Sequence, residues 1–252
     1  MNSISSNLNI MIKAAEKASK VIIRDFGELE KLQVLSKGPS DFVTNSDKKA
    51  EKIIIEELAK YKKKFSLISE EVGEIKNSDL ENFWIIDPID GTTNFLHGVP
   101  HFAISIALKS KKEIISGLIF DPIKNEMFYA EKNNGAYFNN KRIRVSKRKK
   151  MEYCLFASGK IDNENIKQKT NAKLSIRKSG SAALDMAYVA SGRYDGYFQK
   201  NLNLWDIAAG IIIVKEAGGK VNDLNLKQNN NINIIASSSS INEKLLKNLI
   251  NF

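Results

Sequence analysis

The chain has 252 residues, of which 42% are hydrophobic, and its 39 Lys and Arg against 29 Asp and Glu give a formal net charge of +10. This length and composition exclude a disordered chain and permit a sizeable buried core. The single cysteine, Cys154, excludes an intramolecular disulfide and, in its apolar surroundings (YCLFA), predicts a buried thiol in a reducing compartment. Because neither a membrane-spanning apolar run nor a signal peptide is recognised, we expect a cytoplasmic protein.

The sequence of the N-terminal half predicts two amphipathic helices followed by strands. Apolar residues recur at spacings of three and four over residues 8–22, and a second helix is expected after Thr44, which serves as its N-cap behind a loop at residues 38–41. A strand is predicted at residues 65–68, and another at 83–86 that stops at Asp87-Pro88. An antiparallel meander follows, with strands predicted at residues 102–108, 114–121, 126–130, 135–138 and 142–145 and a turn at 133–135.

After residue 150, strands and helices alternate. Strands are predicted at residues 153–157, 194–198 and 232–236, and helices at 181–190, 205–217 and 241–250. A meander followed by such alternation predicts an α/β (α+β) architecture of layered helices and sheets. We expect one domain over residues 1–252, with an N-terminal half of about 1–145 and a C-terminal half of about 146–252.

The most informative segment is Asp87-Pro88-Ile89-Asp90-Gly91-Thr92-Thr93-Asn94. Two carboxylates three residues apart at a strand end would repel each other, and a divalent cation relieves that repulsion. Oxygen ligands favour magnesium over zinc. If a helix begins near Gly91, its free N–H groups would bind an anion such as phosphate. Asp-Pro and Asp-Gly are also ordinary turn dipeptides, but this many specified residues in a row favour the metal interpretation over a structural turn.

Further acids accompany this segment. Glu70 and Glu71 follow the strand predicted at residues 65–68, and Asp206 lies in the first turn of the helix predicted at 205–217. Taken alone, a Glu pair is typical of a solvated edge and a first-turn Asp of a helix cap. Together, Glu70, Asp87, Asp90 and Asp206 are what two or three magnesium ions need to hold a phosphate and an attacking water.

The sequence closely resembles the inositol monophosphatase family of magnesium-dependent, lithium-sensitive phosphomonoesterases, over nearly the whole chain. The resemblance rests on five segments in the family's order: DFVTNSD (41–47), the Glu pair at 70–71, DPIDGTTNFLHG (87–98), GSAALDMAYVASGRYDGYF (180–198) and WDIAAG (205–210). It implies an αβαβα sandwich, a homodimer, and two or three Mg²⁺ ions as cofactors. It also implies hydrolysis of inositol monophosphate by in-line attack of a metal-bound water.

Residue by residue, the resemblance assigns the metal ligands. Glu70, Asp87 and the carbonyl of Ile89 would bind the first magnesium, while Asp87, Asp90 and Asp206 would bind the second. Glu70 would also contact a third ion.

The resemblance likewise assigns catalytic and substrate-binding residues. Thr92 and Glu70 would position the attacking water, Asp47 is the matching outer-shell acid, and Lys37 is aligned with the family's lysine. The backbone of Gly91 and Thr92 would cradle the phosphate. Contacts to the substrate would come from Asp90, Gly91, Thr92, Gly180, Ser181, Ala182, Gln199 and Asp206.

Two positions depart from the family pattern. Ser69 replaces a usual Gly, and Gln199 replaces a Glu that accepts a hydrogen bond from a sugar hydroxyl. The amide carbonyl still accepts, but without a full negative charge. Phosphatase chemistry on another small phosphate therefore stays open: histidinol phosphate, fructose 1,6-bisphosphate, NADP or 3′-phosphoadenosine 5′-phosphate.

The net charge of +10 raises a second alternative, binding to RNA or to a transcription complex. Residues 141–150 hold seven cations. However, 33 of the 39 basic residues are Lys spread along the chain and only 6 are Arg, the residue that planar phosphate recognition favours. We prefer a solvated hairpin and exit loop, because no aromatic platform is interleaved with the charge. We expect a small phosphorylated substrate and no membrane partner.

Overall fold

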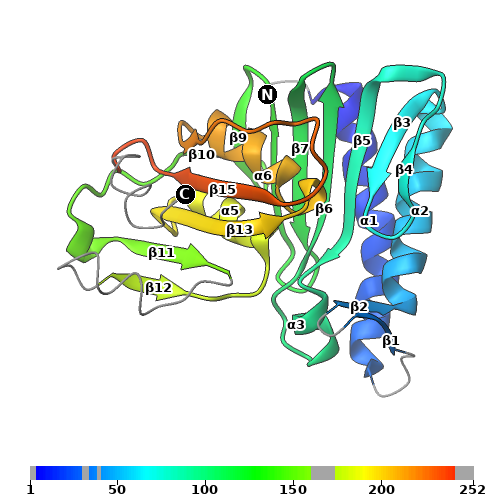
Figure 1. Ribbon diagram of the computed structural model, residues 1–252, viewed down its shortest axis with the longest axis horizontal. Coiled ribbons are helices and arrows are strands. Elements are labelled where there is room, and N and C mark those ends of the chain that lie inside the picture. The colour runs from blue at the N-terminus through cyan, green and yellow to red at the C-terminus, as the bar shows by residue number, and fades with distance from the viewer. Residues whose placement is uncertain (1–3, 30–33, 39–40, 160–173, 242–252) are drawn as a thin grey trace.

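A computed structural model describes residues 4–29, 34–38, 41–159 and 174–241. It has alternating layers of helix and sheet (Figure 1). Helices α1 (Ser6–Gly27) and α2 (Asn45–Lys62) cover one face of an eight-stranded sheet, and α5 (Ala182–Ala190) and α6 (Leu204–Glu216) separate its other face from a five-stranded sheet. No helix in these described ranges is long and apolar enough to cross a membrane.

The large sheet has the strand order β10-β9-β8-β7-β6-β5-β3-β4. All neighbouring strands pair antiparallel except β3 and β5, which are parallel. The predicted meander is therefore confirmed. The strands are β3 (Phe65–Ser69), β4 (Gly73–Ile75), β5 (Asp79–Asp90), β6 (Ala103–Ser110), β7 (Glu113–Asp121), β8 (Glu126–Glu131), β9 (Gly135–Phe138) and β10 (Lys141–Ile143).

The C-terminal half alternates strands and helices as predicted. The small sheet has the order β12-β11-β13-β15-β14. Its strands are β11 (Leu155–Ser158), β12 (Ser175–Arg177), β13 (Gly196–Leu202), β14 (Lys220–Val221) and β15 (Ile232–Ser237). The described part of the chain also holds three short elements: the hairpin β1 (Val34–Gly38) and β2 (Asp41–Thr44), α3 (Thr92–Leu96) and the 3₁₀ turn η2 (Met151–Tyr153).

Side-chain alternation along the central strands builds a core on each face of the large sheet. In β5, Trp84 and Ile86 point into the core beneath α1 and α2, whereas Ile85 points toward α5 and α6. In β6 the large Ile104 and Ile106 face the first core, while small alanines face α6. The core around α5 and α6 draws on both halves of the chain, so it fixes α6 against β5, which carries the acidic segment, and against β6, β7 and β8.

Several boundaries differ from the predictions. The loop expected at residues 38–41 lies between the strands of the β1–β2 hairpin, which include Gly38 and Asp41, while residues 39–40 lie outside the described residues. The strand predicted at residues 153–157 begins only at Leu155 because η2 precedes it. Cys154 therefore lies between η2 and β11, although it is buried as expected. The helix predicted at residues 241–250, which would supply a fifth layer, lies outside the described residues apart from Ile241.

Candidate active site

Three aspartates converge beside the large sheet. Asp87 and Asp90 come from β5, and Asp206 comes from the first turn of α6. Each offers a carboxylate oxygen, and these oxygens all lie within 4.8 Å of one another. Asp87 and Asp90 are buried and Asp206 is half-buried. The structure thus brings together residues that are separated by 119 positions in the chain.

An irregularity in β5 places both of its aspartates at this site. The prediction that the strand stops at Pro88 is wrong, because β5 continues to Asp90. Asp87 pairs with Ser105 and Asp90 with Ala103, so three steps along β5 match two along β6. Residues three apart in a regular strand point to opposite faces, and a bulge corrects this parity. The bulge also accommodates Pro88, which has no N–H to donate to the ladder.

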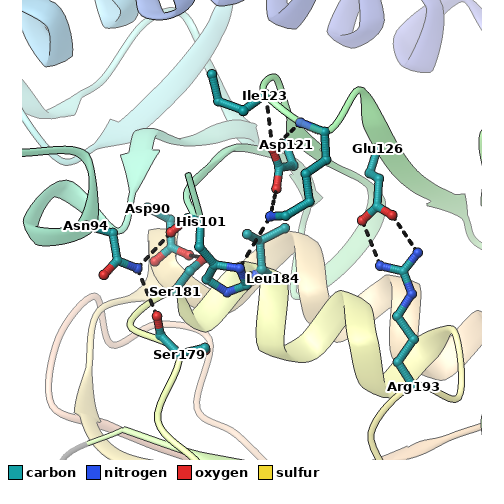
Figure 2. Close-up of polar contacts among 11 residues, drawn as sticks. Asp90, Asn94, His101, Asp121, Ile123, Glu126, Ser179, Ser181, Leu184 and Arg193 are labelled. Atoms are coloured by element: carbon teal, nitrogen blue, oxygen red, sulfur yellow. Dashed lines mark hydrogen bonds and ion pairs between the residues drawn. The ribbon is translucent and has the colours of Figure 1, made fainter. Parts of the chain in front are cut away.

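Asp90 is held by the start of α5 (Figure 2). Ser181, the N-cap of α5, donates its hydroxyl to Asp90 Oδ2, and the backbone N–H of Ala183 donates to the same oxygen at 2.8 Å. Burial raises the pKa of Asp90 to about 6, against the opposing effect of these hydrogen bonds. Ser181 and Ala182, both predicted to contact substrate, therefore lie beside the aspartate cluster.

Asp206 is both a helix cap and a member of the cluster. Its Oδ2 accepts the backbone N–H of Asn203 at 2.8 Å, which with the Asn203 side chain completes a capping box. The capping interpretation and the metal interpretation of this first-turn Asp are thus compatible, since the capping box fixes the orientation of the carboxylate.

Asp87 stands at the centre of the negative charge. Burial raises its pKa well above the usual range, and the carboxylates of Glu70, Asp90, Asp206 and Asp47 raise it further. Glu70 follows β3 and its backbone N–H donates to the carbonyl of Ile86 at 3.3 Å, while Asp47 is buried in the first turn of α2. Four of the acids from the sequence analysis therefore act on Asp87.

The turn from β5 into α3 contributes backbone groups. Gly91, the residue before α3, has φ +104°, and a Cβ there would lie 3.2 Å from the carbonyl oxygen of His101. Ile89 donates its N–H to Asp87 Oδ1 at 3.0 Å, and its carbonyl accepts the Thr92 hydroxyl at 3.0 Å. A helix does begin directly after Gly91, since α3 starts at Thr92.

The role of Asn94 was missed from the sequence. Its Nδ2 donates to the carbonyl of His101 at 2.7 Å and to that of Ser179 at 2.8 Å, which ties α3 to the segment before α5 (Figure 2). Gly180 lies against Gly91 through this link, since a Cβ on Gly91 would be 3.3 Å from the Gly180 carbonyl oxygen. Asn94 is part of the acidic motif, but only the fold reveals its partners.

The two histidines of this region do not join the cluster. His97 is exposed. The ring of His101 places Nδ1 3.4 Å from Lys124 Nζ, and its Nε2 is buried with no partner among the described residues (Figure 2). Burial, followed by the charge of Lys124, lowers the pKa of His101. No imidazole therefore lies in the carboxylate group.

Gln199 and Lys37 complete the predicted site residues. Gln199 lies in β13, and its Oε1 accepts the Tyr197 hydroxyl at 2.7 Å. Lys37 lies in β1, but its side chain is outside what the structure describes.

A further buried acid, Asp185, is close enough to Asp90 to feel its charge and was not expected. The Ser179 hydroxyl donates to its Oδ1, and burial raises the pKa of Asp185 to about 8, with a further rise from the charge of Asp90. The folded protein therefore keeps this proton at pH values where the unfolded chain has lost it, so stability should fall as pH rises from about 4 to 8 and then level off.

Replacing Asp185 by asparagine, which stays neutral, should remove this dependence. The measured quantity is the melting temperature of Asp185→Asn minus that of the wild type. We expect this difference to grow by up to about 3 °C per pH unit between pH 5 and 8, because only the wild type loses stability as the pH rises. Thermal melts in magnesium at several pH values measure it. A constant difference between the two proteins from pH 5 to 8 would show that Asp185 is ionised throughout.

The donor set of the cluster fits a hard divalent cation. It offers carboxylate oxygens, with neither sulfur nor imidazole within the group. Burying several mutually repelling carboxylates is costly unless a cation neutralises them, and the raised pKa of Asp87 expresses that cost. These observations support metal binding by Asp87, Asp90 and Asp206.

Comparisons with known proteins agree with this geometry. Residues 4–251 match the inositol monophosphatase family. An inositol-1-monophosphatase of Rhizobium meliloti is 45% identical over 85% of this chain and 84% of that protein, and the Nus factor SuhB of Escherichia coli K12 is 39% identical over 96% and 95%. The crystal structure of the extragenic suppressor protein suhB from Bartonella henselae superposes with a TM-score of 0.90 at 46% identity, covering 97% of this chain and 98% of that one. This chain belongs to the inositol monophosphatase family, a family of phosphatases.

Proposed function

We propose that this protein is a magnesium-dependent phosphomonoesterase that hydrolyses inositol monophosphate to inositol and phosphate by in-line attack of water. The observation that carries the proposal is the set of carboxylates of Asp87, Asp90 and Asp206, whose oxygens approach within 4.8 Å in a protein of this family. The enzyme needs no nucleophilic side chain, and Cys154 is buried in the outer core of the small sheet.

Two or three Mg²⁺ ions fit these residues. Glu70, Asp87 and the carbonyl of Ile89 would hold one ion, Asp87, Asp90 and Asp206 a second, and Glu70 a third. When bound, magnesium would neutralise charge on the phosphate oxygens and the leaving alkoxide and lower the pKa of the attacking water. The like charges in the cluster support this assignment, because they raise the pKa of Asp87 and a cation would reverse that effect.

The chain's own groups would orient the reactants. Thr92 and Glu70 would position the water, with Asp47 supporting them from α2, and the backbone of Gly91 and Thr92 would cradle the phosphate. The close approach of Gly91 to Gly180 supports a substrate contact by the residues that begin α5. The leaving alcohol would contact Gly180, Ser181, Ala182 and Gln199.

A phosphate-release screen tests the proposal. Inositol 1-phosphate, histidinol phosphate, fructose 1,6-bisphosphate, NADP and 3′-phosphoadenosine 5′-phosphate would each be assayed with magnesium, and again with excess chelator. We expect magnesium-dependent release from inositol 1-phosphate. Faster release from another member would reassign the substrate and keep the chemistry, whereas no release from any member would contradict the phosphatase proposal.

Family membership supports three further proposals. We expect a homodimer, inhibition by lithium, and a cytoplasmic location, in keeping with the unpaired, buried Cys154. Sedimentation of the purified protein, and assays at increasing lithium concentration, test the first two.

The basic segment at residues 141–150 bears on the alternative role in RNA or transcription-complex binding, which the Nus factor name of one relative supports for that relative. Here Arg148 donates through Nε to the buried Asp195 at 2.9 Å, and Val145 is buried. Part of the segment is thus structural, whereas Lys147, Lys149 and Lys150 are exposed. This arrangement supports the hairpin with a solvated exit loop that the sequence analysis preferred.

Neutralising Lys147, Lys149 and Lys150 to glutamine should leave magnesium-dependent phosphate release within about twofold of the wild type, because these side chains are exposed and salt screens exposed charges. A filter-binding assay with a structured RNA at two salt concentrations provides the other measurement. Salt-dependent RNA binding that disappears in the triple variant would favour the binding role.

A further inference from the structure

We propose that Gln199 is a specificity-determining residue that presents an amide N–H to the leaving group and selects substrates carrying a second anionic group, a phosphate or a carboxylate. The proposal rests on the phosphatase chemistry of the proposed function and concerns which phosphate esters the site prefers. It ranks esters with a second anion above inositol 1-phosphate, which has none and is then hydrolysed more slowly. It starts from the orientation of one side chain in β13.

A hydrogen bond from Tyr197 fixes the orientation of the Gln199 amide. Tyr197 and Gln199 are two residues apart in β13 and so share a face, which for Tyr197 is the face packed toward α5 and α6. The buried Tyr197 hydroxyl donates to Gln199 Oε1 at 2.7 Å. The carboxylates of Asp185, Asp90 and Asp206 raise the pKa of Tyr197, after the larger effect of burial, so this hydroxyl is a donor beside the acidic cluster.

A glycine in the neighbouring strand makes room for the amide. Ser158 in β11 pairs with Phe198 in β13, which puts Gly159 next to Gln199. A Cβ at residue 159 would lie only 1.8 Å from Gln199 Oε1 and 2.1 Å from Cδ. The amide therefore lies against the backbone of Gly159 while its oxygen is engaged by Tyr197.

The amide nitrogen is left for a ligand. Nε2 of Gln199 has no hydrogen-bond partner among the described residues, and it is absent from their buried unpartnered atoms, so in this half-buried side chain it reaches solvent. The acceptor is thus turned inward and the donor outward. This orientation was not foreseen from the sequence, where the amide carbonyl was considered as an acceptor for a sugar hydroxyl.

An outward N–H on an uncharged side chain has a definite preference. It binds an anionic oxygen by a charge-assisted hydrogen bond, which is stronger than its bond to a hydroxyl. A carboxylate at the same position would repel a second anion and accept from a hydroxyl instead. For a substrate with a second anion, we expect kcat/KM to be about tenfold higher with the amide at this position than with a carboxylate.

Two matched pairs of esters test the inference. Fructose 1,6-bisphosphate is compared with fructose 1-phosphate, and 3-phosphoglycerate with glycerol 3-phosphate, so that each pair differs by one phosphate or one carboxylate. The measured quantity is the kcat/KM of the ester with the additional anion divided by the kcat/KM of its partner. Gln199→Glu should lower the ratio at least about tenfold in whichever pair reports the preferred anion. The two pairs therefore distinguish phosphate from carboxylate.

Two further variants test the fixed orientation. Tyr197→Phe frees Oε1 and lets the amide turn, and Gly159→Ala displaces the amide, so both should reduce the same ratio. Circular dichroism and thermal melts confirm that the buried Tyr197→Phe site still folds. Asn201→Asp adds a negative charge at an exposed position of the same strand and separates a local hydrogen bond from general electrostatics.

The outcomes separate the two proposals. Release of phosphate from no ester contradicts the phosphatase function itself. If the esters are hydrolysed but the ratios change less than threefold in Gln199→Glu, the role of Gln199 is overturned and the phosphatase function stands. The same conclusion follows if the ratios change equally in Asn201→Asp.

Discussion

Replacing Asp87 by asparagine should lower kcat about a thousandfold or more while the protein stays folded, since charge stabilisation by a metal at this site is worth several kcal/mol. Asp87 is the acid on which Glu70, Asp90, Asp206 and Asp47 all act. Asparagine has nearly the same shape and still offers an oxygen to the N–H of Ile89, but it lacks the charge that holds a divalent cation.

The stability of this variant gives a second, independent measurement. Removing one of several mutually repelling buried charges should leave the chelated protein as stable as the wild type or more so. Magnesium should then raise the melting temperature of the wild type more than that of Asp87→Asn, because only the wild type binds the ion tightly. Kinetics and thermal melts with magnesium and with chelator measure both effects.

Asp223→Asn is the matched control, because Asp223 is exposed and lies outside the carboxylate cluster. It removes the same charge and should retain activity and the response to magnesium. Full magnesium-dependent activity in Asp87→Asn would contradict the assignment of this aspartate as a metal ligand.

The sequence predicted most elements because their signals are local. The stripe in α1 and the alternation in β6 and β7 depend on nearby residues, and both were found. The bulge in β5 was not, because it depends on how Asp87 and Asp90 pair with Ser105 and Ala103 in another strand. The stop expected at Pro88 follows a sound rule for central strands, and the bulge is the recognised exception to it.

The candidate site also has features that the sequence predicts and features that only the fold reveals. The acidic motif, Glu70 and Asp206 were found from their residue types and their places at strand and helix ends, and the resemblance to the family added Asp47. Hydrogen bonds between distant segments were not predictable, since nothing in the sequence indicates that Asn94 joins the segment before α5, or that Tyr197 engages the oxygen of Gln199. Such contacts depend on which elements the fold places side by side.

Removing the hydroxyl of Thr92 should lower kcat about a hundredfold or more, the range in which a positioned proton-transfer group acts. Thr92 begins α3, and its hydroxyl donates to the carbonyl of Ile89 at 3.0 Å. Because its proton is committed to that carbonyl, its oxygen is left to accept a hydrogen bond from water. We expect Thr92→Val to lose this acceptor while keeping the shape of the side chain.

Thr92→Ser is the matched control, since it retains the hydroxyl on a smaller side chain and should keep kcat within about tenfold of the wild type. The magnesium concentration for half-maximal activity should change little in either variant, because the carboxylates of the cluster are intact. Pre-steady-state kinetics on inositol 1-phosphate would separate hydrolysis from product release. If Thr92→Val hydrolyses at a rate within threefold of Thr92→Ser, the hydroxyl orients no water, and the attacking oxygen must be positioned by Glu70 without it.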